Sequence, residues 1–123
     1  MPGKLHIAIP RLLTNDVKAT SEWYVRNLGF TASFFYPDAE TAEYAGLRRD
    51  EIELHLSHAI VDPRKNETMV YIRVEGIEEL YAQARANGVV HPNGHLQRKP
   101  WRQLEFAVLD PNGNLLTYGQ ETD

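Results

Sequence analysis

Cysteine is absent from this sequence of 123 residues. The chain therefore has no disulfide bond, no thiolate nucleophile and no zinc site built on cysteine ligands. Long apolar runs are also missing, since none approaches the roughly 18 residues that a membrane-spanning helix needs. The opening stretch MPGKLHIAIP alternates polar and apolar residues, where a secretory signal would have a continuous apolar segment. These absences exclude several enzyme classes and predict a cytoplasmic protein that does not enter a membrane.

An excess of positive charge is missing as well. The sequence has 13 Lys and Arg against 17 Asp and Glu, which gives a net charge of -4 and a pI of about 5.7. Nucleic-acid binding depends on clustered basic residues, so no nucleic acid is expected as a partner. Hydrophobic residues at 42% and charged residues at 24% are ordinary for a globular protein, and the length fits a single domain over residues 1–123. A neutral or cationic small molecule suits this charge better than an anionic polymer.

The spacing of apolar residues predicts a strand, a helix and three more strands in the first half. The stretch KLHIAIPRLLTND alternates through Leu5, Ile7 and Ile9, with Pro10 limiting the strand to an edge or a bend. The period then changes to that of an amphipathic helix over residues 15–29, capped by Asn15 or Asp16 and ended by Gly29. Strand-like stretches follow at residues 30–36, 42–49 and 51–57.

The same order of elements recurs in the second half. A strand at residues 68–74 precedes a helix at 75–88, a loop at 89–100, and strands at 104–110 and 114–120. Both helices carry a Glu-x-Tyr unit followed by a glycine: Glu22, Tyr24 and Gly29 in the first, Glu79, Tyr81 and Gly88 in the second. This pattern predicts an internal duplication of residues 1–62 and 63–123. The alternative, that any α+β protein shows some such echo, stays open here.

Four blocks of sequence carry a resemblance to a known family. They are AIPRLLTNDVKATSEWYVRNLGF, YAGLRRDEIELHLS, VEGIEELYA and PWRQLEFAVLDPNGNLLTYGQ. In order and spacing they resemble the bleomycin resistance proteins of the vicinal-oxygen-chelate superfamily, which also contains glyoxalase I and extradiol dioxygenases. The resemblance implies an α+β fold of two βαβββ modules and a homodimer whose N-terminal strand is exchanged around Pro10. It also implies clefts at the dimer interface that sequester a drug without catalysis.

Metal chemistry is the first question for any member of this superfamily. The four positions that hold metal ligands in its enzymes fall here on Ile9, Glu53, Met69 and Thr117. One carboxylate with a thioether and a hydroxyl does not make a site for a divalent metal, so no metal, no catalytic residue and no cofactor are expected. The five histidines keep an alternative metal site open, although His55 and His58 point to opposite faces of one strand.

The candidate binding residues come from strand faces and from the resemblance. Alternation in EIELHLS directs Glu53 and His55 away from the apolar face, and alternation in TMVYIRV does the same for Tyr71 and Arg73. The resemblance places Tyr71 and Trp101 where relatives carry two tryptophans that stack on the drug. Phe34 and Tyr44 match two further aromatic positions, Ser33 replaces an acidic residue, and Thr117 lines the same cleft. An alternative role for Tyr71 and Phe34 is packing at a sheet or dimer interface.

The sequence thus predicts a metal-free homodimer that binds a planar heteroaromatic ligand such as bleomycin. Ser33, Tyr71 and Arg73 depart from the family pattern, and the stretch FFYPDAETAEY is longer than in those relatives. Two alternatives remain. One is a lyase, isomerase or dioxygenase of the same superfamily that uses a metal or Glu53 as a base, with His55 as its partner. The other is a binding protein for a different planar metabolite.

Overall fold

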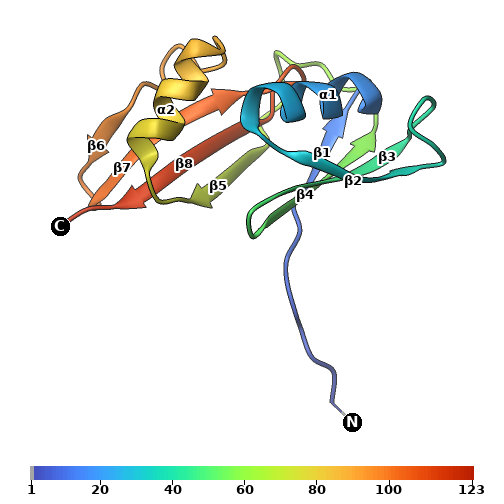
Figure 1. Ribbon diagram of the computed structural model, residues 1–123, viewed down its shortest axis with the longest axis horizontal. Helices are drawn as coiled ribbons and strands as arrows, with labels where there is room; N and C mark the ends of the chain where they lie inside the picture. Colours follow the sequence, from blue (N-terminus) through green and yellow to red (C-terminus); the bar gives the residue numbers. More distant parts are fainter. Residues whose placement is uncertain (1) are drawn as a thin grey trace.

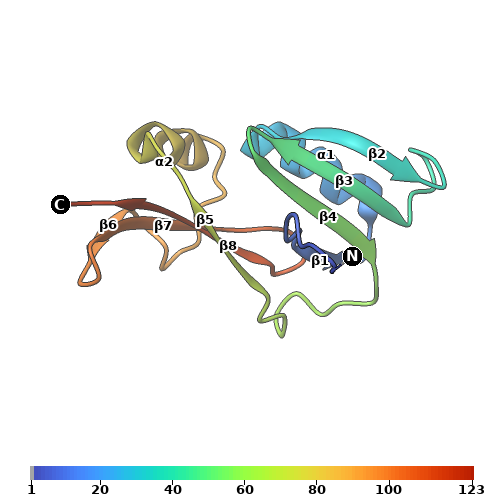
Figure 2. The ribbon, with the colours of Figure 1, turned by 90° about the horizontal axis from the view of Figure 1, so that it is seen from below.

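Two similar sheets, each covered on one face by a helix, lie side by side in the computed structural model, which describes residues 2–123 (Figure 1). The elements are β1 (Arg11–Thr14), α1 (Val17–Leu28), β2 (Thr31–Tyr36), β3 (Tyr44–Arg49), β4 (Ile52–His58), β5 (Met69–Arg73), α2 (Ile77–Ala86), β6 (Gln97–Lys99), β7 (Gln103–Leu109) and β8 (Leu115–Glu121). Both helices cover the same side of the molecule, so the two sheets leave their other faces open (Figures 1 and 2).

The first module is a sheet with the strand order β1-β4-β3-β2, in which β1 runs parallel to β4. Helix α1 begins at the cap residue Asp16, whose carboxylate accepts a hydrogen bond from the amide of Ala19 at 3.0 Å. It ends at Gly29, which has a φ of 73° that glycine adopts without strain. The buried face of α1, including Tyr24, packs on the apolar side chains of this sheet. The sequence therefore predicted this helix and its ends correctly.

The second module repeats this arrangement. Its sheet has the order β5-β8-β7-β6, with β5 parallel to β8 and α2 packed on β7 and β8. Each module is thus a strand, a helix and three strands joined in the same order, which confirms the predicted α+β fold of two βαβββ modules. The shared order supports the duplication of residues 1–62 and 63–123, which stays a prediction.

The turn between β7 and β8 joins the two modules through a buried polar network. Asp110 accepts a 2.7 Å hydrogen bond from the hydroxyl of Tyr24 in α1, and Asn112 donates to Thr20 at 2.9 Å. Asn114 donates to the backbone carbonyl of Leu13 in β1 at 3.2 Å. These groups are buried but satisfy one another, so their burial does not destabilise the fold. The DPNGN turn is therefore a link between modules as well as a hairpin.

Two sequence expectations were wrong. The strand expected from Leu5 to Ile9 does not form: β1 begins at Arg11, and residues 2–10 form an arm that extends away from the body (Figure 1). The arm is anchored at its end, where the Pro10 carbonyl accepts a 2.9 Å hydrogen bond from the His55 amide. Leu5 and Ile7 are 99% and 66% exposed because nothing in the single chain covers them. The loop expected over residues 89–100 contains the short strand β6, which pairs with β7 despite the breaking residues around it. Among residues 2–123, no helix is long and apolar enough to cross a membrane.

Candidate functional site

Aromatic side chains gather on the open face of the first sheet. The rings of Phe34 and Tyr44 are nearly parallel, with centroids 6.1 Å apart and an interplanar angle of 16°. His55 meets both rings edge-on, with centroids 5.5 Å from Phe34 and 5.2 Å from Tyr44. We call Phe34, Tyr44 and His55 the first aromatic group. Three strands supply one residue each, so the sheet itself fixes how the rings meet.

A bulge in β2 brings Ser33 onto the same face as Phe34. The register with β3 shifts between Ala32 and Phe34, so Ser33 is an extra residue without a partner. A β-carbon added at Gly46, opposite Phe34, would meet the Phe34 ring and, at 2.8 Å, the Ser33 hydroxyl. Regular alternation would place two consecutive residues on opposite faces. The bulge therefore allows both predicted residues to face the same space.

A chain of hydrogen bonds runs across this face from Arg48 to Tyr44. Arg48 Nη2 lies 2.7 Å from Glu53 Oε1, and Glu53 Oε2 lies 2.9 Å from His55 Nε2. His55 Nδ1 is 2.7 Å from the Tyr44 hydroxyl. In the neutral ring, Nε2 donates to the Glu53 carboxylate and Nδ1 accepts from Tyr44. Both nitrogens of His55 and both oxygens of Glu53 are thus engaged within the protein.

The open face of the second sheet carries the other predicted aromatic residues. The Tyr71 hydroxyl is 2.9 Å from Glu105 Oε2 and 3.0 Å from Gln103 Oε1. Trp101 Nε1 donates to the same Glu105 oxygen at 2.9 Å. We call Tyr71 and Trp101 the second aromatic group. Burial, followed by the hydrogen bond to Glu105, raises the pKa of Tyr71, so its hydroxyl stays protonated and can donate.

The charged residues of this face are partly neutralised. Arg73 adds a positive charge to this face, but its Nη1 lies 2.7 Å from Glu121 Oε1 on β8. Lys99 Nζ lies 5.8 Å from the centroid of the Trp101 ring, close enough for a cation-π contact. Thr117 is half-buried and pairs with Tyr71 in the β5–β8 register. The face therefore combines aromatic rings with an arginine whose charge is balanced by Glu121.

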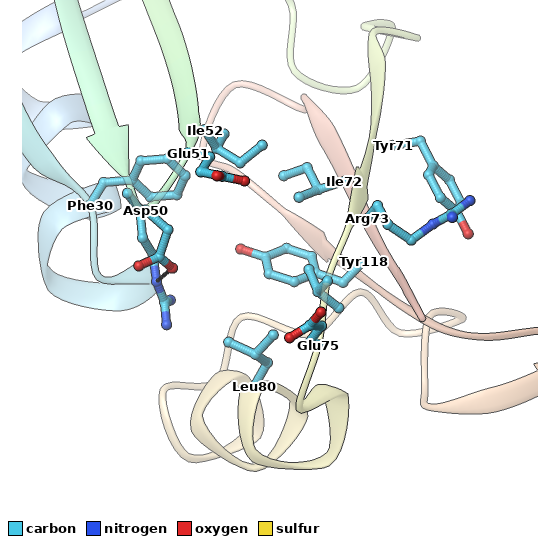
Figure 3. A pocket seen from close by; sticks show the side chains of 12 residues that line it. Phe30, Asp50, Glu51, Ile52, Tyr71, Ile72, Arg73, Glu75, Leu80 and Tyr118 are labelled. Carbon is cyan, nitrogen blue, oxygen red and sulfur yellow. Dashed lines mark ion pairs between the residues drawn. The ribbon is translucent and has the colours of Figure 1, made fainter. Parts of the chain in front are cut away.

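A cleft of about 780 Å³ lies between the modules. Its walls include Phe30 and Ile52 from the first module and Ile72, Leu80 and Tyr118 from the second. Figure 3 shows Ile72 and Tyr118 on one side of β5 and the side chains of Tyr71 and Arg73 on the other. Tyr71 and Arg73, two of the predicted binding residues, also border this cleft, so it adjoins the second aromatic group. Its lining combines apolar side chains of the two modules with charged residues at the mouth: Arg49, Asp50, Glu51, Arg73 and Glu75.

The residues at the implied metal positions do not fit a metal. Ile9 and Met69 offer no oxygen or nitrogen ligand, and Glu53 is already paired with Arg48 and His55. Among residues 2–123, no group of three or more His, Asp and Glu side chains lies close enough to hold an ion.

The predicted site residues fall into two groups, one on each sheet. Within the described chain, no hydrogen bond or ring contact connects the first aromatic group with the second. Sequence reasoning missed Arg48 and Glu105, the two charged residues that hold these groups. Alternation along β7 does place Glu105 on the face opposite Phe106 and Val108, but nothing local indicates that Tyr71, 34 residues earlier, reaches it.

Paired βαβββ modules with open, aromatic sheet faces define the class of protein. The chain belongs to the glyoxalase/bleomycin resistance protein/dioxygenase superfamily, whose family model matches residues 5–118. It is 32% identical to the bleomycin resistance proteins of Geobacillus stearothermophilus and Staphylococcus aureus, over 93% of this chain and 96% of each relative. These findings confirm the resemblance seen in the sequence.

Solved structures show the same fold. A bleomycin-binding protein from bleomycin-producing Streptomyces verticillus, complexed with copper(II)-bleomycin, is 29% identical, with a TM-score of 0.76 over 95% of this chain and 97% of that one. A bleomycin resistance determinant encoded on the transposon Tn5 is 23% identical, with a TM-score of 0.80 over 95% of this chain and 98% of that one. The latter likeness concerns the fold alone.

Proposed function

We propose that this protein is a cytoplasmic, non-catalytic binding protein that sequesters bleomycin or a bleomycin-type antibiotic stoichiometrically. The observation that carries the proposal is the pair of aromatic groups on the open sheet faces, in a chain whose relatives are bleomycin resistance and bleomycin-binding proteins. Planar heteroaromatic ligands suit such walls, because stacking and cation-π contacts contribute about 0.5 to 2 kcal/mol each and apolar burial adds more.

The binding cleft is proposed to form between two copies of the chain. Each aromatic group faces open space, and the two groups make no contact within the described chain. The arm of residues 2–10 exposes Leu5 and Ile7, which a single chain leaves uncovered. Exchange of this arm between two copies would bury both side chains, and a closed dimer would place an aromatic group from each chain around one ligand.

A binding role fits the hydrogen bonding of Glu53 and His55 better than catalysis does. A general base needs an orientation in which it reaches the proton of a bound substrate. Glu53 is held by Arg48 and His55, and His55 is held by Glu53 and Tyr44. Because their hydrogen-bonding groups are already engaged within the protein, a structural role is favoured. In this role the hydrogen bonds keep the Tyr44 ring in place beside Phe34.

Titration with metal-free bleomycin tests the proposal. The chain has two tryptophans, so a Trp23→Phe background leaves Trp101 as the reporter of binding. We expect quenching of the Trp101 fluorescence that saturates near one drug per chain, and a large loss of affinity in Trp101→Ala measured by calorimetry. A flat titration at high micromolar drug would contradict antibiotic sequestration. In that case, native mass spectrometry of freshly purified protein would show whether another planar molecule occupies the site.

A further inference from the structure

Glu105 is a buried carboxylate that receives both donors of the second aromatic group. Its side chain lies on β7 and is only 7% exposed. The Tyr71 hydroxyl and the Trp101 indole N–H both lie 2.9 Å from one oxygen, Oε2. No Lys, Arg or His within residues 2–123 forms an ion pair with Glu105. Two aromatic side chains from distant parts of the sequence thus donate hydrogen bonds to a single atom, Glu105 Oε2.

The backbone is arranged so that both rings can reach this atom. Tyr71 belongs to β5, and β8 separates it from β7 in the sheet. Gly119 of β8, the direct partner of Glu105, provides the passage, because a β-carbon there would overlap the Tyr71 hydroxyl. Trp101 reaches Glu105 through a turn of the backbone between β6 and β7. Arg102 in this turn has a φ of 63°, and the turn brings the Trp101 indole within hydrogen-bonding distance of Glu105.

A carboxylate is a costly residue at this position if its role is only to support the fold. Burial removes much of its hydration, and two neutral donors do not replace a positively charged partner. Trp101 is 61% exposed and Tyr71 is 48% exposed, so packing alone does not fix their rotamers. Both rings would otherwise sample several orientations, and a ligand would have to order them at a cost in entropy.

We propose that Glu105 is a positioning residue that holds Tyr71 and Trp101 in a fixed relative orientation before the ligand arrives. The inference rests on the proposed function and adds to it the residue that determines the geometry of the second aromatic group. The Glu105 carboxylate binds the polar edge of each ring. The flat surfaces of both rings therefore remain available for a planar ligand. Glu105 acts through the two rings and is not assigned a contact of its own with the ligand.

The test compares Glu105→Ala and Glu105→Gln in the Trp23→Phe background of the full chain. Glutamine keeps one oxygen that can accept from both donors, whereas alanine keeps none. We expect Glu105→Ala to weaken bleomycin binding on the order of tenfold, and Glu105→Gln to stay within about threefold of the parent. In nitrogen-15 NMR spectra without ligand, the indole N–H resonance of Trp101 should move in the alanine variant and stay near its original position in the glutamine variant.

Glu78→Gln is the matched control and should bind as the parent does, because Glu78 is an exposed acidic residue of α2, the helix that covers the opposite face of the same sheet. Equal losses of affinity in Glu105→Gln and Glu105→Ala would overturn the inference. Such losses would show that the negative charge of Glu105, and not its hydrogen bonds to the two rings, supports binding. An unchanged indole resonance in Glu105→Ala would overturn it as well. If the parent protein does not bind bleomycin, the proposed function fails, while the NMR comparison still decides the role of Glu105. Urea unfolding of each variant verifies that it is folded.

Discussion

The pKa values of three tyrosine hydroxyls are raised, and each hydroxyl has a different environment. Tyr24 is buried in the network around Asp110, and Tyr71 donates to Glu105. Tyr118 is buried beside the cleft between the modules, and its hydroxyl points into that cleft (Figure 3). Burial is the largest cause in all three cases and raises each pKa, to about 12 for Tyr118.

These shifts predict how stability depends on alkaline pH. The pKa of Tyr118 in the folded protein is raised above the unfolded value of about 10. Its contribution to the free energy of unfolding is therefore fully present below pH 10 and is lost as the pH rises through about 12. A shift of two units corresponds to about 3 kcal/mol at most. In Tyr118→Phe, the free energy of unfolding should fall less steeply above pH 10 than in the wild type, although Tyr24 and Tyr71 still titrate.

Urea denaturation at a series of pH values, with tyrosinate absorbance as a second readout, measures this difference. Tyr36→Phe serves as the control because the Tyr36 side chain is exposed. If Tyr118→Phe loses stability in parallel with the wild type up to pH 12, the raised pKa of Tyr118 is refuted.

At the scale of the elements, both sheets use a glycine as a passage for an aromatic ring. Phe34 from β2 lies across Gly46 of β3, and Tyr71 from β5 lies across Gly119 of β8. Neither glycine has a positive φ, so the missing side chain is needed for space and not for backbone conformation. The rings can therefore lie flat on the sheet, where a larger residue would lift them.

Alanine at either glycine should displace the ring above it. In Gly119→Ala the new methyl group overlaps the end of the Tyr71 side chain, which can swing away, so we expect a stability loss of about 1 kcal/mol but a clear loss of bleomycin affinity. In Gly46→Ala the methyl group overlaps the Phe34 ring itself, and the stability loss should be larger, about 1 to 3 kcal/mol. Gly3→Ala, which meets nothing within 4 Å, is the control.

Calorimetric titration and urea unfolding of the three variants separate these effects. Unchanged affinity in Gly119→Ala would show that the position of Tyr71 does not matter for binding.

The periodic elements were predictable from the sequence because their signals are local. Helix α1, with its cap at Asp16 and its end at Gly29, and the alternation in β4 and β5 follow from neighbouring residues alone. The bulge at Ser33 was not predictable, because an extra residue in a strand has no signature without its partner strand. Glu105 was missed for the same reason: its two partners meet it only through sheet pairing and a turn.

At the scale of the whole molecule, the exposed arm is the part that a single chain does not complete. Hydrophobic residues alternate along residues 5–9, as in a strand, yet these residues pair with nothing in the described chain. Full burial of a side chain such as Leu5 or Ile7 contributes about 1.5 to 3 kcal/mol, a driving force for association with a second copy. The strand that the alternation predicts over residues 5–9 needs a neighbouring strand, which the single chain does not provide.

Polar substitutions on the arm should therefore weaken the proposed dimer. We expect the wild type to elute as a dimer in size-exclusion chromatography with light scattering, and Leu5→Asp combined with Ile7→Asp to shift it toward the monomer and to weaken bleomycin binding. His6→Gln, which lies between these positions, should leave the dimer unchanged. A wild type that is monomeric at millimolar concentration would contradict arm exchange and a cleft shared by two chains.

The polar network at the DPNGN turn has a consequence for how this chain evolves. Tyr24 in the first module donates to Asp110 in the second, whereas Tyr81, at the matching place in the second helix, packs on Phe106. The two modules are alike in topology but are not interchangeable. The Tyr24 hydroxyl is one of four donors to Asp110, so a mutation in the first half of the gene changes the hydrogen bonding of a turn encoded by the second half.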